Sequence, residues 1–162
     1  FPCHYLAAGL VFGAAALTDL FDGKIARGRG LVTNLGKFLD PIADKMLTTA
    51  AFLGFLAVGK LDVFAVMLIL SREFMVTSVR LMAAKGDVVM AASIWGKAKT
   101  VSQMAAVGIV LLIQELLQLE WLPARFPAAA VQSAVIWISV ILTVISGVLY
   151  LRDNKKFVDP SK

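Results

Sequence analysis

The stretch Asp19–Asp44 reads DLFDGKIARGRGLVTNLGKFLDPIAD and places four aspartates beside long apolar segments. The chain around it has 162 residues, of which 59% are hydrophobic and only 17% are charged. A soluble domain of ordinary composition has about a quarter of its residues charged. The mean hydropathy of +0.82 therefore indicates a membrane protein, and the length fits one domain, residues 1–162.

Five segments are apolar over about 20 residues, the length that a helix needs to cross the hydrocarbon of a bilayer. The apolar runs are too long for strands and lack a strand's alternation. The segment between the third and fourth runs is too short and too polar to span, so we expect a connector that is partly helical. The sequence thus predicts an all-α polytopic membrane protein with helices at about Tyr5–Ile25, Pro41–Val58, Leu61–Ala83, Thr100–Leu119 and Ala128–Leu151.

Basic residues alternate between rich and poor segments along the whole chain. The rich segments are the first connection, the third connection and the tail, whereas the second and fourth connections are poor. The positive-inside rule makes the rich ends cytoplasmic, so the four aspartates are expected at the cytoplasmic face of a multi-pass protein. The net charge is +5, and the basic residues that produce it cluster between apolar spans. This placement argues against nucleic acid as a partner and favours membrane lipids. The rich segments hold Lys24, Arg27, Arg29 and Lys37, then Arg80, Lys85, Lys97 and Lys99, then Arg152, Lys155, Lys156 and Lys162.

The four aspartates form two pairs with helical spacing. Asp19 and Asp22 are three residues apart, and Asp40 and Asp44 are four apart, so each pair shares one helical face. Antiparallel packing of the two helices brings all four carboxylates together, where their repulsion calls for a counter-charge. Carboxylate oxygens suit Mg²⁺ or Mn²⁺. Alternatively, the aspartates are interfacial acids paired with Lys24, Arg27 and Lys45.

Two glycines lie close to these acids. Gly23 and Gly36 carry no side chain and leave room for a ligand to approach the backbone. Arg27 lies one helical turn beyond Gly23 and is suitably placed to contact a phosphate.

The same residues match the pattern D-x2-D-G-x2-A-R-x8-G-x3-D-x3-D, with every spacing kept. In this chain the eight positions are Asp19, Asp22, Gly23, Ala26, Arg27, Gly36, Asp40 and Asp44. The pattern resembles that of the CDP-alcohol phosphotransferase family. The segments Ser71–Gly86 and Ser93–Met104 resemble the bacterial branch that forms phosphatidylglycerophosphate. Family members have six transmembrane helices, and we expect this sequence to begin at the second.

The resemblance implies a transfer at phosphorus in the bacterial cytoplasmic membrane. The substrates would be CDP-diacylglycerol and sn-glycerol 3-phosphate, and the products phosphatidylglycerophosphate and CMP. Two Mg²⁺ or Mn²⁺ ions would be held by the four aspartates, and a homodimer is expected by analogy. The implied roles are metal binding for Asp19, Asp22, Asp40 and Asp44, general-base catalysis for Asp44, and nucleotide binding for Asp22, Gly23, Ala26, Arg27 and Gly36.

The acceptor carries a phosphate of its own, so a second basic pocket is expected. Arg72 lies in the middle of an apolar span, where an arginine is functional or paired. We predict that Arg72, Arg80 and Lys97 bind this phosphate, with Thr33, Lys37 and Lys99 as secondary candidates. Two alternatives stay open: Glu73 forms an internal ion pair with Arg72 or Arg80, and Lys97 and Lys99 bind anionic lipid headgroups.

Three other functions are compatible with parts of the pattern. The same reaction can use another alcohol, such as serine or inositol phosphate. A divalent-cation transporter would use the aspartates as its ion site, but such sites are expected near the midplane of the bilayer. An inactive structural membrane protein would not account for two pairs of aspartates at helical spacing.

Overall fold

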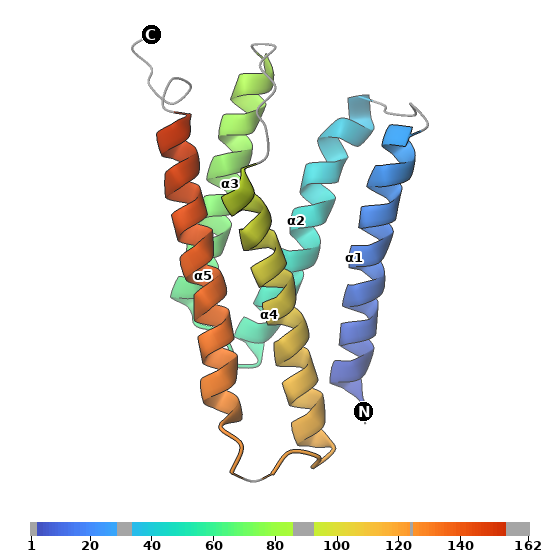
Figure 1. The fold of residues 1–162 in the computed structure, drawn as a ribbon. Coiled ribbons are helices and arrows are strands. Elements are labelled where there is room, and N and C mark those ends of the chain that lie inside the picture. The colour runs from blue at the N-terminus through green and yellow to red at the C-terminus, as the bar shows by residue number, and fades with distance from the viewer. Residues whose placement is uncertain (1–2, 29–33, 86–92, 124, 155–162) are drawn as a thin grey trace.

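The computed structural model describes residues 3–28, 34–85, 93–123 and 125–154, except for the side chains of residues 19, 20, 22–28, 34–44, 84 and 85. Within this part of the chain the fold is an all-helical bundle without strands. The helices are α1 (His4–Gly28), α2 (Asn34–Ala57), α3 (Val63–Lys85), α4 (Ile94–Gln118) and α5 (Ala128–Asp153) (Figure 1).

The five predicted helices are confirmed, and two of them begin earlier than hydropathy indicates. Helix α2 begins at Asn34 rather than Pro41, and α4 begins at Ile94 rather than Thr100. The extra turns hold the charged residues Lys37 and Asp40 in α2 and Lys97 and Lys99 in α4, and therefore fall outside an apolar window. At α4 the Ser93 hydroxyl accepts a hydrogen bond of 3.0 Å from the Gly96 amide, a regular N-cap. The connector predicted to be partly helical thus contributes the first turns of α4.

The helices run up and down, so the connections fall at two opposite ends of the bundle (Figure 1). One end holds the start of α1, the α2–α3 turn and the α4–α5 connection, and these two connections are the poor segments of the sequence. The other end holds the C-terminal ends of α1, α3 and α5 and the N-terminal ends of α2 and α4. All three rich segments therefore adjoin the same end, which we call the basic end.

Packing is strongest between α4 and α5, followed by α3 with α5 and α1 with α4. A hydrophobic core joins α2, α3, α4 and α5, with Phe52, Ile136 and Val110 among its buried members. Polar bonds cross the α4–α5 interface as well: Gln103 donates to Thr143, and Gln114 donates to Gln132. Small buried residues and hydrogen bonds across the interface are the usual means by which helices associate inside a membrane.

The outward surface of the bundle is apolar on every helix. Leu10 of α1, Met46 of α2, Phe74 of α3, Leu112 of α4 and Val148 of α5 are all more than half exposed. Water would penalise this surface, whereas lipid tails accommodate it. Helices α4 and α5 are long and apolar enough to cross a membrane, and shorter apolar helical segments lie at 4–18 and 45–57.

Candidate functional site

The four aspartates lie on α1 and α2, which pack against each other. The backbone is helical at all four positions, so the spacing of three and of four residues corresponds to neighbouring positions on each helix. Their side chains lie outside the described residues, and their convergence stays a prediction. The side chains of Ala26, Arg27 and Lys37 also lie outside the described residues, as does the whole of Thr33, and the predicted roles of these residues and of Gly23 and Gly36 stay predictions.

The donor set of this cluster fits a divalent cation. Four carboxylates offer only hard oxygen ligands, which Mg²⁺ and Mn²⁺ prefer. The adjacent, antiparallel helices α1 and α2 carry two of the aspartates each, in the half of each helix that leads to the basic end (Figure 1). Among the residues with described side chains, no cluster of three or more His, Cys, Asp or Glu competes for this role. The chemistry of the residues therefore supports the predicted metal site.

A cavity of about 480 Å³ with several charged residues in its lining lies between α2, α3, α4 and α5 on the side of the basic end. Its described lining holds five basic side chains and a single acid, Glu73. An excess of positive charge in a concave, partly buried site favours an anionic ligand. All three residues predicted to bind the acceptor phosphate line this one cavity. The basic side chains are Lys45, Arg72, Arg80, Lys97 and Lys99.

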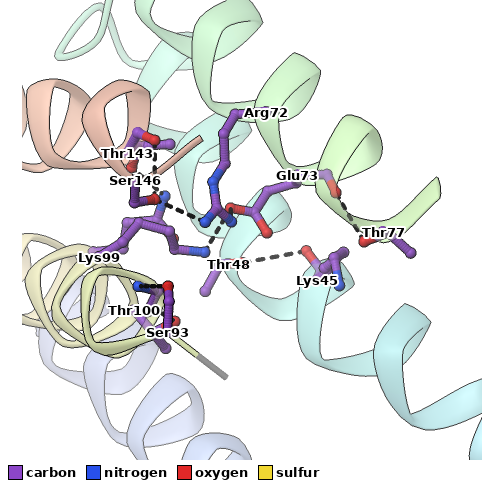
Figure 2. Close-up of polar contacts among 12 residues, drawn as sticks. Lys45, Thr48, Arg72, Glu73, Thr77, Ser93, Lys99, Thr100, Thr143 and Ser146 are labelled. Carbon is purple, nitrogen blue, oxygen red and sulfur yellow. Dashed lines mark hydrogen bonds and ion pairs between the residues drawn. The ribbon is translucent and has the colours of Figure 1, made fainter. Parts of the chain in front are cut away.

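Glu73 is the centre of a buried ionic triad (Figure 2). Its Oε1 atom accepts from Nη1 of Arg72 at 3.3 Å and from Nζ of Lys99 at 2.5 Å. Arg72 and Glu73 are each 8% exposed, and Lys99 is 6% exposed. One carboxylate thus faces two cations, so the three side chains together carry a surplus of positive charge. The alternative in which Glu73 pairs with Arg72 is thus what the structure has, while binding of the acceptor phosphate by Arg72 stays a prediction. Lys99 is too deeply buried to serve as a surface contact for lipid headgroups.

Arg80 and Lys97 lie nearer the opening of the cavity. Both side chains are exposed, and the Arg80 guanidinium carbon lies 5.9 Å from the ring centre of Tyr150. A cation over an aromatic face is held in place without losing its charge. No ion pair joins Arg80 to Glu73 among the described residues, where Glu73 pairs with Arg72 and Lys99. Glu73 therefore does not offset the positive charge of Arg80, which can attract an anion into the cavity.

Sequence reasoning missed several residues of the cavity. Lys45 follows the predicted base Asp44 directly and lines the cavity from α2, yet it was considered only as a partner for the acids. The contribution of α5 was also missed. From α5, Tyr150 lines the cavity, and Ser146, four residues earlier, is hydrogen-bonded to Arg72. Both are buried polar residues on an otherwise apolar helix, and their spacing of four residues is the signal that the sequence carries.

Comparison with known proteins agrees with this arrangement. A profile of the CDP-alcohol phosphatidyltransferase family matches residues 1–145. The chain is 40% identical over 153 residues to a CDP-diacylglycerol–glycerol-3-phosphate 3-phosphatidyltransferase of Bacillus subtilis, covering 94% of this chain and 76% of the relative. A protein of the same name from Rickettsia bellii is 36% identical over 156 residues, covering 96% and 83%.

A third relative comes from Mycobacterium tuberculosis and is named a probable phosphatidylglycerophosphate synthase. It is 38% identical over 159 residues, covering 93% of this chain and 70% of the relative. The match to the family extends over most of the chain and includes the eight-position pattern and the cavity residues of α2, α3 and α4, but it ends at residue 145, before Tyr150 of α5. The chain belongs to the CDP-alcohol phosphatidyltransferase family of membrane enzymes.

Proposed function

We propose that the protein transfers the phosphatidyl group of CDP-diacylglycerol to sn-glycerol 3-phosphate. The 1-hydroxyl oxygen of the acceptor attacks the β-phosphorus, and a new phosphorus–oxygen bond forms. The bond between that phosphorus and the oxygen of CMP breaks, so CMP leaves and phosphatidylglycerophosphate remains. The relatives' names support this choice of donor and acceptor.

The aspartate cluster would hold the donor and carry out the proton transfer. Asp44 takes the proton of the attacking hydroxyl as bonding to phosphorus develops. Asp19, Asp22 and Asp40 would be the main ligands of two divalent ions, with Asp44 as a further ligand. Such ions, when bound, supply neutralisation of the diphosphate charge. Asp22, Gly23, Ala26, Arg27 and Gly36 shape the place of the cytidine nucleotide.

The observation that carries the proposal is the basic cavity beside α2. It is lined by Lys45, the residue after Asp44, and by the triad around Glu73. A phosphomonoester bound there neutralises the surplus charge of the triad, and Arg72 can offer two parallel N–H bonds to it. A hydroxyl carried by the same molecule then lies toward the aspartate end of α2. Holding both reacting groups in this way removes much of the entropic cost of the reaction.

The distribution of charge supports a bacterial cytoplasmic membrane location with the site facing the cytoplasm. Every rich segment adjoins the basic end of the bundle, and positive residues are retained on the cytoplasmic side. The protein crosses the membrane several times and works as a homodimer, the latter by analogy with the family alone.

An acceptor panel tests the proposal. The full-length protein in detergent is given CDP-diacylglycerol and Mg²⁺, and CMP release is followed with sn-glycerol 3-phosphate, glycerol, serine and inositol phosphate. We expect rapid release only with sn-glycerol 3-phosphate. Release with serine but not with sn-glycerol 3-phosphate would overturn the choice of acceptor, and no release with any alcohol would overturn the enzymatic reaction.

A further inference from the structure

Two neighbouring residues of α5 hold the side chain of Arg72. Nη2 of Arg72 donates a hydrogen bond of 2.7 Å to the hydroxyl of Ser146 (Figure 2). At Gly147, an added Cβ would lie only 2.7 Å from Cγ of Arg72 and 3.7 Å from its Nε. Real Cβ atoms essentially never make contacts under 3.0 Å, so any side chain at Gly147 would displace the stem of the arginine.

The Ser146 hydroxyl is oriented to accept. Its own proton is donated to the carbonyl oxygen of Thr143, at 3.1 Å, and a serine hydroxyl has only one proton. Its lone pairs are therefore left for Arg72. Ser146 is 1% exposed, so water does not compete with this bond, and the guanidinium keeps one direction.

The guanidinium is thereby fixed at both Nη atoms. Nη1 donates a hydrogen bond to Glu73, and Nη2 donates one to Ser146. Each Nη atom carries a second N–H group, and these groups belong to a side chain that lines the basic cavity. A planar fork that is fixed before the ligand arrives binds a phosphate with less loss of conformational entropy.

We infer that Ser146 and Gly147 are positioning residues for the acceptor phosphate, and that both act through Arg72. Ser146 fixes the direction of the guanidinium, and Gly147 leaves the space that the arginine stem occupies. The inference rests on the proposed function, because it takes Arg72 as a ligand of the acceptor. It predicts a defect in acceptor use that spares the CDP-diacylglycerol donor.

The first experiment compares Gly147→Ala and Ser146→Ala with matched controls in the full-length protein. Gly108→Ala is the control for the glycine, because it lies in α4 with no atom within 4 Å of an added Cβ. Ser139→Ala is the control for the serine: it lies in α5, and its buried hydroxyl has no hydrogen-bond partner among the described residues. We expect the KM for sn-glycerol 3-phosphate to rise about tenfold in both test variants. The KM for CDP-diacylglycerol should stay unchanged, and both controls should stay within about twofold of the parent protein.

Ser146→Thr provides the conservative rescue, because it keeps the accepting oxygen and should restore most of the acceptor KM. A second measurement separates positioning from general packing. If Gly147 acts through Arg72, then Gly147→Ala should add nothing in a protein that already carries Arg72→Ala, where the added Cβ meets no arginine stem. Such non-additivity is expected only for residues that act as a unit.

The inference is overturned if Gly147→Ala keeps the acceptor KM of Gly108→Ala. It is also overturned if the double variant loses a further tenfold beyond Arg72→Ala, or if both substrates' KM values rise together. These outcomes leave the proposed function standing, because the parent protein would still release CMP with sn-glycerol 3-phosphate. Failure of the parent protein itself to do so would instead overturn the proposed function.

Discussion

Lys99 of α4 donates a hydrogen bond to the carboxylate of Glu73 on α3, although 26 positions separate the two residues in sequence. The bond is buried, and Glu73 also faces Arg72. In a low dielectric the attraction between such charges is large, but so is the cost of removing them from water. This ionic triad therefore both ties two helices together and keeps positive charge available in the cavity.

Removing the acid from the triad should destabilise the protein. Glu73→Gln leaves Arg72 and Lys99 without the carboxylate that now faces both of them. Breaking a buried ion pair from one side costs about 3 kcal/mol, so we expect a clear fall in Tm, measured by thermal unfolding in detergent. Glu120→Gln is the control, because Glu120 is exposed beyond the end of α4. Equal Tm values for the two variants would contradict a role of Glu73 in holding the triad.

The cations at the cavity opening should govern use of the acceptor. Arg80→Ala and Lys97→Ala each remove one positive charge from the lining. Because both side chains are exposed, we expect a rise in the KM for sn-glycerol 3-phosphate of about threefold to tenfold, smaller than for Arg72. Lys60→Ala is the control, since Lys60 lines a separate cavity with Trp137. If KM is unaltered in both test variants, the acceptor phosphate binds elsewhere.

Asp44 should be required for turnover but not for donor binding. Asp44→Asn keeps the size of the side chain and removes its basicity, so kcat should fall by about 100-fold or more. Binding of CDP-diacylglycerol should persist, because the other three aspartates remain. Asp62→Asn is the control: Asp62 accepts the Phe64 amide at 2.8 Å before α3, and asparagine caps helices equally well. Full activity in Asp44→Asn would show that another group is the base.

The orientation of the bundle can be tested with single cysteines. The native Cys3 is first replaced by Ser; the hydrogen bond to Glu115, burial and the charge of Glu115 together raise the pKa of its thiol, so its labelling at neutral pH would be slow and hard to interpret. A cysteine is then placed at Lys60 or at Arg152, which lie near opposite ends of the bundle. In intact cells we expect a membrane-impermeant maleimide to label the Lys60 position, and the Arg152 position only after permeabilisation. The reverse pattern would place the basic end outside.

The sequence was sufficient for the helices and for which end of the bundle is basic. Apolar runs of membrane length predicted all five helices, because their lipid-facing surfaces, such as those of Leu112 and Val148, cannot be polar. Helix starts were less accurate. The first turns of α2 and α4 lie beyond the apolar runs because charged residues interrupt them, and hydropathy carries no signal for the N-cap that Ser93 provides.

The cavity was predicted only in part. Arg72 stands out in sequence because an arginine inside an apolar span is costly unless it is paired or functional. Arg80 and Lys97 were predicted because they are basic residues of a rich segment at the same end of the bundle. The contacts that hold Arg72 depend on how α5 lies against α3, which sequence spacing alone does not give. Ser146 and Gly147 are ordinary residues of an apolar helix until the arginine is packed against them.

The central claim is that the phosphatidyl group passes directly to sn-glycerol 3-phosphate. The most direct test is a mass balance: the full-length protein is incubated with CDP-diacylglycerol and radiolabelled sn-glycerol 3-phosphate, and free CMP and lipid-bound label are counted in the same samples. We predict that the two rise in equal molar amounts, and that both fail to rise in Asp44→Asn. CMP that accumulates without label in the lipid would mean that water or another alcohol is the acceptor, and would contradict the claim.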